Sequence, residues 1–190
     1  MKKISIVLLA AVVAFSSFTL LDTWKIDKAH SQLGFSITHL GVSDVNGYIK
    51  TFDVTIKAEK PDYSDAVVEL TGDMASITTG IDMRDNHLKG PDFFDAAKYP
   101  AINFISTGLM SAGNNKYKVT GNLTFHGVTK PVTLDLLYRG TVANPQSTEA
   151  VAGFQVTGVI KRSDFGIATG FPAAMLGDDV TIKADGEFSK

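Results

Sequence analysis

The chain alternates apolar and polar residues in eight separate segments, with the period of two that a half-buried β-strand requires. In the first segment one face carries Leu33, Phe35, Ile37 and His39. The same alternation marks residues 32–39, 51–58, 68–74, 101–110, 117–125, 132–138, 152–160 and 180–188. Because most connections between these segments are short, the pattern predicts an all-β fold, either an antiparallel barrel or a sandwich.

The alternation stops in one long stretch, residues 79–100. Here Met83 and His87 stand four residues apart, which places them on one side of a helical turn or two. A smaller break at residues 171–179 is apolar and predicts a loop or a short helix. No linker, repeat or low-complexity tract separates the strands, so we expect one β domain with a short helical insertion.

The N-terminus has the layout of a secretory signal peptide. Lys2 and Lys3 precede the uncharged stretch 4–21. We expect a signal peptide over residues 1–19, a mature domain over 20–190, and a periplasmic or secreted protein. The alternative is an uncleaved anchor, because this stretch has about the minimum length that spans a bilayer. Its serines and threonine weaken that alternative.

Composition removes several classes of function. The 190 residues carry a formal net charge of −2, which argues against binding to nucleic acid, since that needs a concentrated positive surface. The chain has no cysteine, which excludes disulfides, thiolate nucleophiles and cysteine metal sites. It also lacks a nucleophile elbow, a P-loop and a zinc-protease motif. We therefore expect neither an enzyme nor a cofactor.

An eight-stranded barrel is the smallest common size whose interior holds one small ligand. Glycines on the inward faces could leave space for a ligand, or they could permit the sharp coiling of a barrel whose core is filled. The periodicity of the sequence does not distinguish a hollow interior from a filled one. If the interior is hollow, His39 and Arg84 should supply polarity near one end. The predicted apolar lining comprises Leu33, Phe35, Ile37, Phe52, Val54, Leu70, Met74, Phe104, Val119, Leu123, Leu134, Phe154, Val156 and Ile182.

Two polar residues are candidates for contact with a ligand's head group. His39 continues the inward face of its strand, where a neutral imidazole can hydrogen-bond a head group. Its alternative is a structural role against the helical insertion. Arg84 offers bidentate pairing to a phosphate. Its alternative is a structural ion pair with Asp82, Asp85 or Asp164.

Other polar residues are expected to support turns. His30 follows the start of a strand, and His126 ends one. Arg162 and Asp164 bracket a tight turn that ends at Gly166, where mutual pairing or backbone capping is expected. The four histidines are far apart in sequence and have no cysteine partner, so we predict no metal site.

Four blocks of sequence resemble the YceI-like family, in the family's order. The first is Trp24 to Leu40 (WKIDKAHSQLGFSITHL), and the second is Asp82 to Asp95 (DMRDNHLKGPDFFD). The third is Gly121 to Val132 (GNLTFHGVTKPV). The fourth, RSDFGI from Arg162, is followed by the closing GDDV. Together the blocks cover nearly the whole expected mature chain.

This resemblance implies an extended lipocalin-like barrel of eight antiparallel strands that is exported in many bacteria. It implies an interior that binds a polyisoprenoid or another long amphiphile, such as an isoprenoid quinone or a fatty amide. It also implies a possible homodimer and no established enzymatic activity. We therefore expect an exported carrier or scavenger. The alternatives are a cavity enzyme, either a hydrolase or an isomerase, and a structural or partner-binding β domain.

Overall fold

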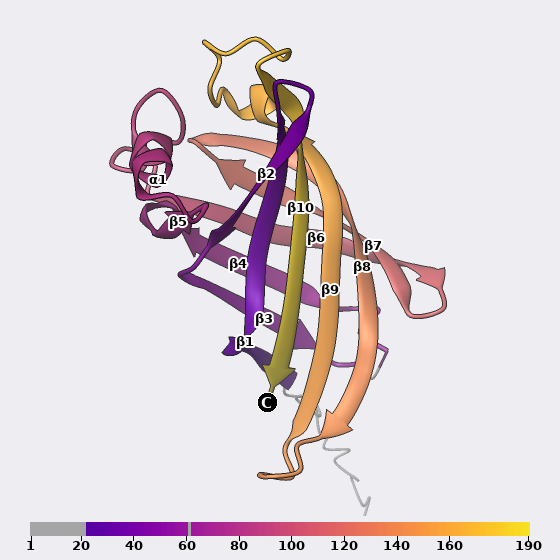
Figure 1. Ribbon diagram of the computed structural model, residues 1–190. Helices are drawn as coiled ribbons and strands as arrows, with labels where there is room; N and C mark the ends of the chain where they lie inside the picture. The colour runs from indigo at the N-terminus through magenta and orange to yellow at the C-terminus, as the bar shows by residue number, and fades with distance from the viewer. Residues whose placement is uncertain (1–21, 61) are drawn as a thin grey trace, which may run out of the picture.

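The structure is a computed structural model that describes residues 22–60 and 62–190. The expected signal peptide, residues 1–19, lies outside the described residues. Strands dominate the chain (Figure 1). The elements are β1 (Asp22–His39), β2 (Ser43–Ile49), β3 (Phe52–Ala58), β4 (Val67–Asp73), η1 (Met74–Ser76), β5 (Ile77–Thr78), α1 (Asp82–Lys89), β6 (Ala101–Gly113), β7 (Lys116–Phe125), β8 (Val128–Ala143), β9 (Ala150–Lys161), η2 (Arg162–Phe165) and β10 (Leu176–Ser189).

Eight of the strands close into an antiparallel barrel. The neighbours run β10-β9-β8-β7-β6-β4-β3-β1, and β1 pairs again with β10 to complete the circle. Each of these eight strands overlaps one of the eight alternating segments of the sequence, to within one residue at the ends of β3 and β4. The predicted eight-stranded antiparallel barrel with a lipocalin-like arrangement is thereby confirmed.

Strand β1 is long because it pairs with two different strands along the same edge. Its first residues, Asp22 to Lys25, pair with β3, whereas Leu33 to His39 pair with β2. Strand β5 then pairs with the end of β2 and extends this part of the wall. The sequence pattern missed β2 and β5 and placed the start of β1 ten residues too late, at residue 32 instead of 22.

The helical insertion is confirmed at α1, which lies within the predicted stretch 79–100. It sits beside β5 at one end of the barrel, where the β1–β2 hairpin and the loop before β10 also lie (Figure 1). We call this end the mouth. The described part of the chain contains no helix long and apolar enough to cross a membrane.

Inward-facing glycines accept side chains from neighbouring strands. A Cβ atom at Gly121 would lie 2.4 Å from Cζ of Phe104, and one at Gly158 would lie 2.4 Å from Cδ2 of Leu134. Such an approach requires a residue without a side chain. These glycines therefore let apolar side chains of the next strand lie flat against the wall. The cavity keeps its width because these bulky side chains do not project into its centre.

Candidate functional site

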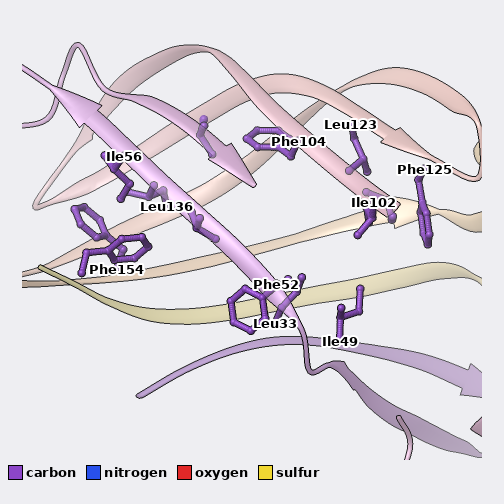
Figure 2. Packing of buried hydrophobic residues seen from close by; sticks show 14 of the residues in the cluster. Leu33, Ile49, Phe52, Ile56, Ile102, Phe104, Leu123, Phe125, Leu136 and Phe154 are labelled. Atoms are coloured by element: carbon purple, nitrogen blue, oxygen red, sulfur yellow. The ribbon is translucent and has the colours of Figure 1, made fainter. Parts of the chain in front are cut away.

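The barrel encloses a cavity of about 470 Å³. This is within the range of small-molecule sites, roughly 300–1,000 Å³. The interior is therefore hollow, and the alternative of a filled barrel is wrong. The ten residues labelled in Figure 2, among them Leu33, Phe52, Phe104 and Phe154, all line this cavity.

All sixteen residues predicted from sequence line the cavity. They come from all eight barrel strands, together with η1 and α1, because the inward phase of each strand was read correctly. Which of them contact a ligand stays a prediction. They are Leu33, Phe35, Ile37, His39, Phe52, Val54, Leu70, Met74, Arg84, Phe104, Val119, Leu123, Leu134, Phe154, Val156 and Ile182.

Aromatic rings close the end of the cavity opposite the mouth. Phe154 lines the cavity, and its ring lies 5.2 Å from that of Tyr63 and 5.3 Å from that of Tyr138. Trp24 packs edge-on against Tyr63 at 5.9 Å. Tyr63 is buried although it belongs to the loop between β3 and β4, so that loop closes the barrel from below. We call these rings the aromatic floor.

The polar lining residues gather at the mouth. Five of the seven polar residues of the lining come from the end of β1, the segment after β5, helix α1 and the turn after β9. The remaining two are Gln32 and Asp185. Asp185 accepts hydrogen bonds from Arg139 and Gln155. The five polar residues at the mouth are His39, Thr79, Arg84, His87 and Arg162.

Arg84 is held at the mouth by Thr79. Its Nε donates to the Thr79 hydroxyl at 2.7 Å, and its Nη2 donates to the Thr79 carbonyl at 3.0 Å. The ion pair proposed as its alternative, with Asp82, Asp85 or Asp164, does not form. Its Nη1 donates to no described residue, so this half-buried guanidinium keeps free donors beside the cavity.

Asp85 holds the segment of Thr78 and Thr79 through hydrogen bonds. Its carboxylate accepts hydrogen bonds from the Thr78 hydroxyl and from the Thr79 backbone N–H, both at 2.7 Å. Burial alone would raise the pKa of this carboxyl. The hydrogen bonds from Thr79 and Thr78 outweigh burial, so its pKa lies below the ordinary value. Thr79 thus joins a buried anion to the cation at the mouth.

Arg162 organises the loop before β10 from inside the protein. It is 6% exposed and donates to five backbone carbonyls, from Ile167, Ala168, Phe171, Leu176 and Gly177, at 2.6–3.1 Å. Backbone capping is therefore confirmed for this arginine, and pairing with Asp164 is wrong. Asp164 lies 3.9 Å from Lys130 instead.

The other histidines do not form a shared site. His126 has a positive φ of 50° and donates from Nδ1 to the Phe165 carbonyl at 3.1 Å, as expected of a turn residue. His30 lies 2.8 Å from Asp27, whose hydrogen bond raises the pKa of the imidazole. Together with Glu187 they form a group of possible metal ligands. None of these three residues lines the cavity.

Sequence reasoning missed the lining residues of the irregular segments. Strand β2 contributes Val45 and Ile49, whose segment carries poor β-formers. Others come from the insertion and from the loop before β10, where no periodicity marks an inward face. Apolar pairs in these stretches, such as Phe93-Phe94, were the available signal. These missed loop residues are Phe93, Phe94, Ile167, Ala168 and Phe171. Further lining residues, such as Ile56, Leu136 and Ile160, lie on the inward faces of predicted strands but were not included in the predicted set.

The fold and cavity define a lipocalin-like binding barrel, and comparison with known proteins gives its family. The YceI-like domain matches residues 24–188, so the chain belongs to the YceI-like family. The chain is also 37% identical to a UPF0312 protein of Staphylococcus aureus strain MSSA476 over 173 residues. That match covers 89% of this chain and 98% of the relative.

Solved structures share the same barrel. BcnA of Burkholderia cenocepacia superposes with a TM-score of 0.78 at 29% identity, covering 85% of this chain and 98% of BcnA. A YCEI protein of Campylobacter jejuni gives 0.73 at 35% identity, covering 93% and 99%. A polyisoprenoid-binding domain of Saccharophagus degradans gives 0.63 over 90% and 99%, at 16% identity, and so shares the fold alone.

Proposed function

We propose that this protein is an exported, non-enzymatic carrier or scavenger of a long apolar amphiphile, such as a polyisoprenoid, an isoprenoid quinone or a fatty amide. One observation carries the proposal: the barrel is hollow and lined by apolar side chains, with the aromatic floor at one end and polar residues at the other. This is the arrangement that accepts an apolar tail first and leaves a polar head at the opening.

The energetics favour selection by length. Burial of one methylene contributes about 0.8 kcal/mol before ordering costs. A long tail therefore binds well without a strong polar contact. The free donors of Arg84 and the exposed imidazole of His39 stand where a head group would lie. We propose that the sixteen predicted lining residues contact the ligand.

A chain-length series tests this function. Isoprenoid alcohols of increasing length are titrated into delipidated protein, and native mass spectrometry of untreated protein identifies any lipid that co-purifies. We expect affinity to rise with each added unit until the tail reaches the aromatic floor. Affinity that does not change with length, or that depends on a divalent metal and on His39, would contradict this proposal and favour the cavity enzyme.

Export is part of the proposal and has its own test. We propose cleavage of the signal peptide near residue 19 and release to the periplasm or the medium. N-terminal sequencing of the mature protein should begin between Ser17 and Thr23. Retention of Met1 in a cytosolic protein would refute export and leave the binding proposal intact. A homodimer stays a prediction, which a solution mass measurement decides.

A further inference from the structure

Exposed apolar side chains are concentrated around the mouth. Eleven large hydrophobic residues of the described chain are exposed, and five of them lie on the segments that surround the opening. Val42 and Met83 are the most exposed, each at 82%. We call these five residues the mouth rim. They are Leu40, Val42, Ile81, Met83 and Met175.

The rim segments are connected to one another around the opening. The backbone N–H of Leu40 donates to the Met175 carbonyl at 2.9 Å, which joins the β1–β2 hairpin to the loop before β10. The ring of Phe171 in that loop lies 5.0 Å from Phe93, and Phe93 lies 4.8 Å from His87 of α1. Figure 1 shows the three segments at the same end of the barrel.

The rim is also poor in charge. Residues 36–43 and 165–177 contain no acidic or basic residue apart from His39. Formal charges near the mouth come from α1 and the segment after it, from the buried Arg162, and from Asp44 and Asp178, which directly follow the two uncharged stretches. The apolar rim is continuous with the cavity, because Met175 and its neighbour Leu176 also line it. An aqueous protein partner with charged contacts does not fit such a surface, whereas the apolar part of a bilayer does.

We propose that the mouth rim docks on a lipid bilayer, so that cargo passes between the bilayer and the cavity without entering water. This inference rests on the proposed function, since it assigns the place where the amphiphile enters. A tail that crosses water exposes every methylene, and contact between rim and bilayer removes that barrier. The hairpin stretch 36–43 and the loop stretch 165–177 are uncharged apart from His39, and α1 carries two acidic and two basic residues that balance. Docking should therefore need no anionic lipid and should depend little on salt.

Vesicle flotation tests the docking. The purified protein is mixed with vesicles of phosphatidylcholine alone, and the floated fraction is compared between two double variants. V42S/M83S removes apolar side chains from the rim. M110S/V142S removes the same residue types from exposed positions far from the mouth, each 67% exposed. We expect about tenfold weaker vesicle binding for the rim variant and no change for its matched control.

A transfer assay then links docking to cargo. The rate at which a fluorescent isoprenoid alcohol leaves the vesicles for the protein should rise with vesicle concentration, and V42S/M83S should abolish that rise. Neither Val42 nor Met83 lines the cavity, so loading from a water-miscible solvent should stay unchanged.

The possible outcomes separate the docking inference from the function on which it rests. Wild-type protein that loads from solvent but does not float with vesicles overturns the docking. The same holds if both double variants float equally, or if the rim variant changes only the mass of a dimer. Wild-type protein that does not load from solvent overturns the proposed function itself.

Discussion

Replacing Arg162 with methionine should loosen the mouth and destabilise the whole barrel. The guanidinium is buried and donates to five backbone carbonyls between Ile167 and Gly177. Three of these carbonyls lie in the loop between η2 and β10, which contains no regular element, and the other two belong to the first residues of β10. Much of the loop's conformation therefore depends on one side chain. Methionine keeps apolar length but provides no donor.

The size of the effect follows from the number of hydrogen bonds. A bond from a charged donor contributes about 1.5–3 kcal/mol, so five independent bonds would sum to about 7–15 kcal/mol. That sum equals the whole stability of a typical domain. The loop lies at the barrel's end and can turn its carbonyls to water, so we expect a loss of about 3–5 kcal/mol. Lysine has three donors, and Arg162→Lys should fall between methionine and the wild type.

Urea unfolding measures this loss, and hydrogen exchange over residues 166–176 locates it. The matched control is Lys161→Met, which removes the same charge from the neighbouring, exposed side chain that pairs with Asp179 at 2.7 Å. An exposed pair contributes about 0–1 kcal/mol, so the control should stay within that range. If the free energy of unfolding of Arg162→Met lies within 1 kcal/mol of that of the control, or if hydrogen exchange in the loop is unchanged, Arg162 does not organise the mouth.

Three further changes probe the floor, the head-group end and the segment beneath Arg84. Phe154→Asp puts an unpaired charge in the cavity and should abolish loading or folding, whereas Val159→Asp on the outer face should do neither in a binding and unfolding assay. His39→Ala should change the preference between alcohol and phosphate head groups more than total affinity, as measured by competition. Asp85→Asn should cost about 2 kcal/mol in urea unfolding at neutral pH. Because the pKa of Asp85 is lowered in the folded protein, its contribution to the free energy of unfolding is complete above the unfolded value of 3.8 and declines as the pH falls below it. The free energy of unfolding of Asp85→Asn, measured over the same acid range, should lack that decline.

The wall of the barrel was predictable because its residues obey one period. Every predicted strand faces the cavity with the predicted phase, as Val119 and Leu123 of β7 show. Strand β2 escaped because Asp44, Asn46 and Gly47 are poor strand formers, and only pairing with β1 holds them extended. The ring of Phe35 lies over Gly47, where a Cβ atom would stand 2.4 Å from Cζ. Glycine is therefore required at this position by a contact with another strand, and such a contact leaves no pattern in the neighbouring sequence.

The mouth could be predicted only in part, for a different physical reason. Arg84 and His39 were placed near an opening by strand phase and by the break in the pattern. The partner of Arg84 is Thr79, five residues away, and a search for opposite charges does not find a threonine. Arg162 binds carbonyl groups, which every residue possesses, so its partners depend on the path of the loop and not on residue type.

The division between wall and mouth bears on how a carrier releases its cargo. The wall is closed by continuous strand pairing, and opening it would break a ladder of hydrogen bonds. The mouth is held by two compact polar centres, Arg162 under one loop and Asp85 with Thr79 under the other. Loosening either centre costs less than opening the wall, so ligand exchange should occur at the mouth. The same segments carry the exposed apolar rim, and contact with a bilayer would therefore act on the part of the barrel that is easiest to open.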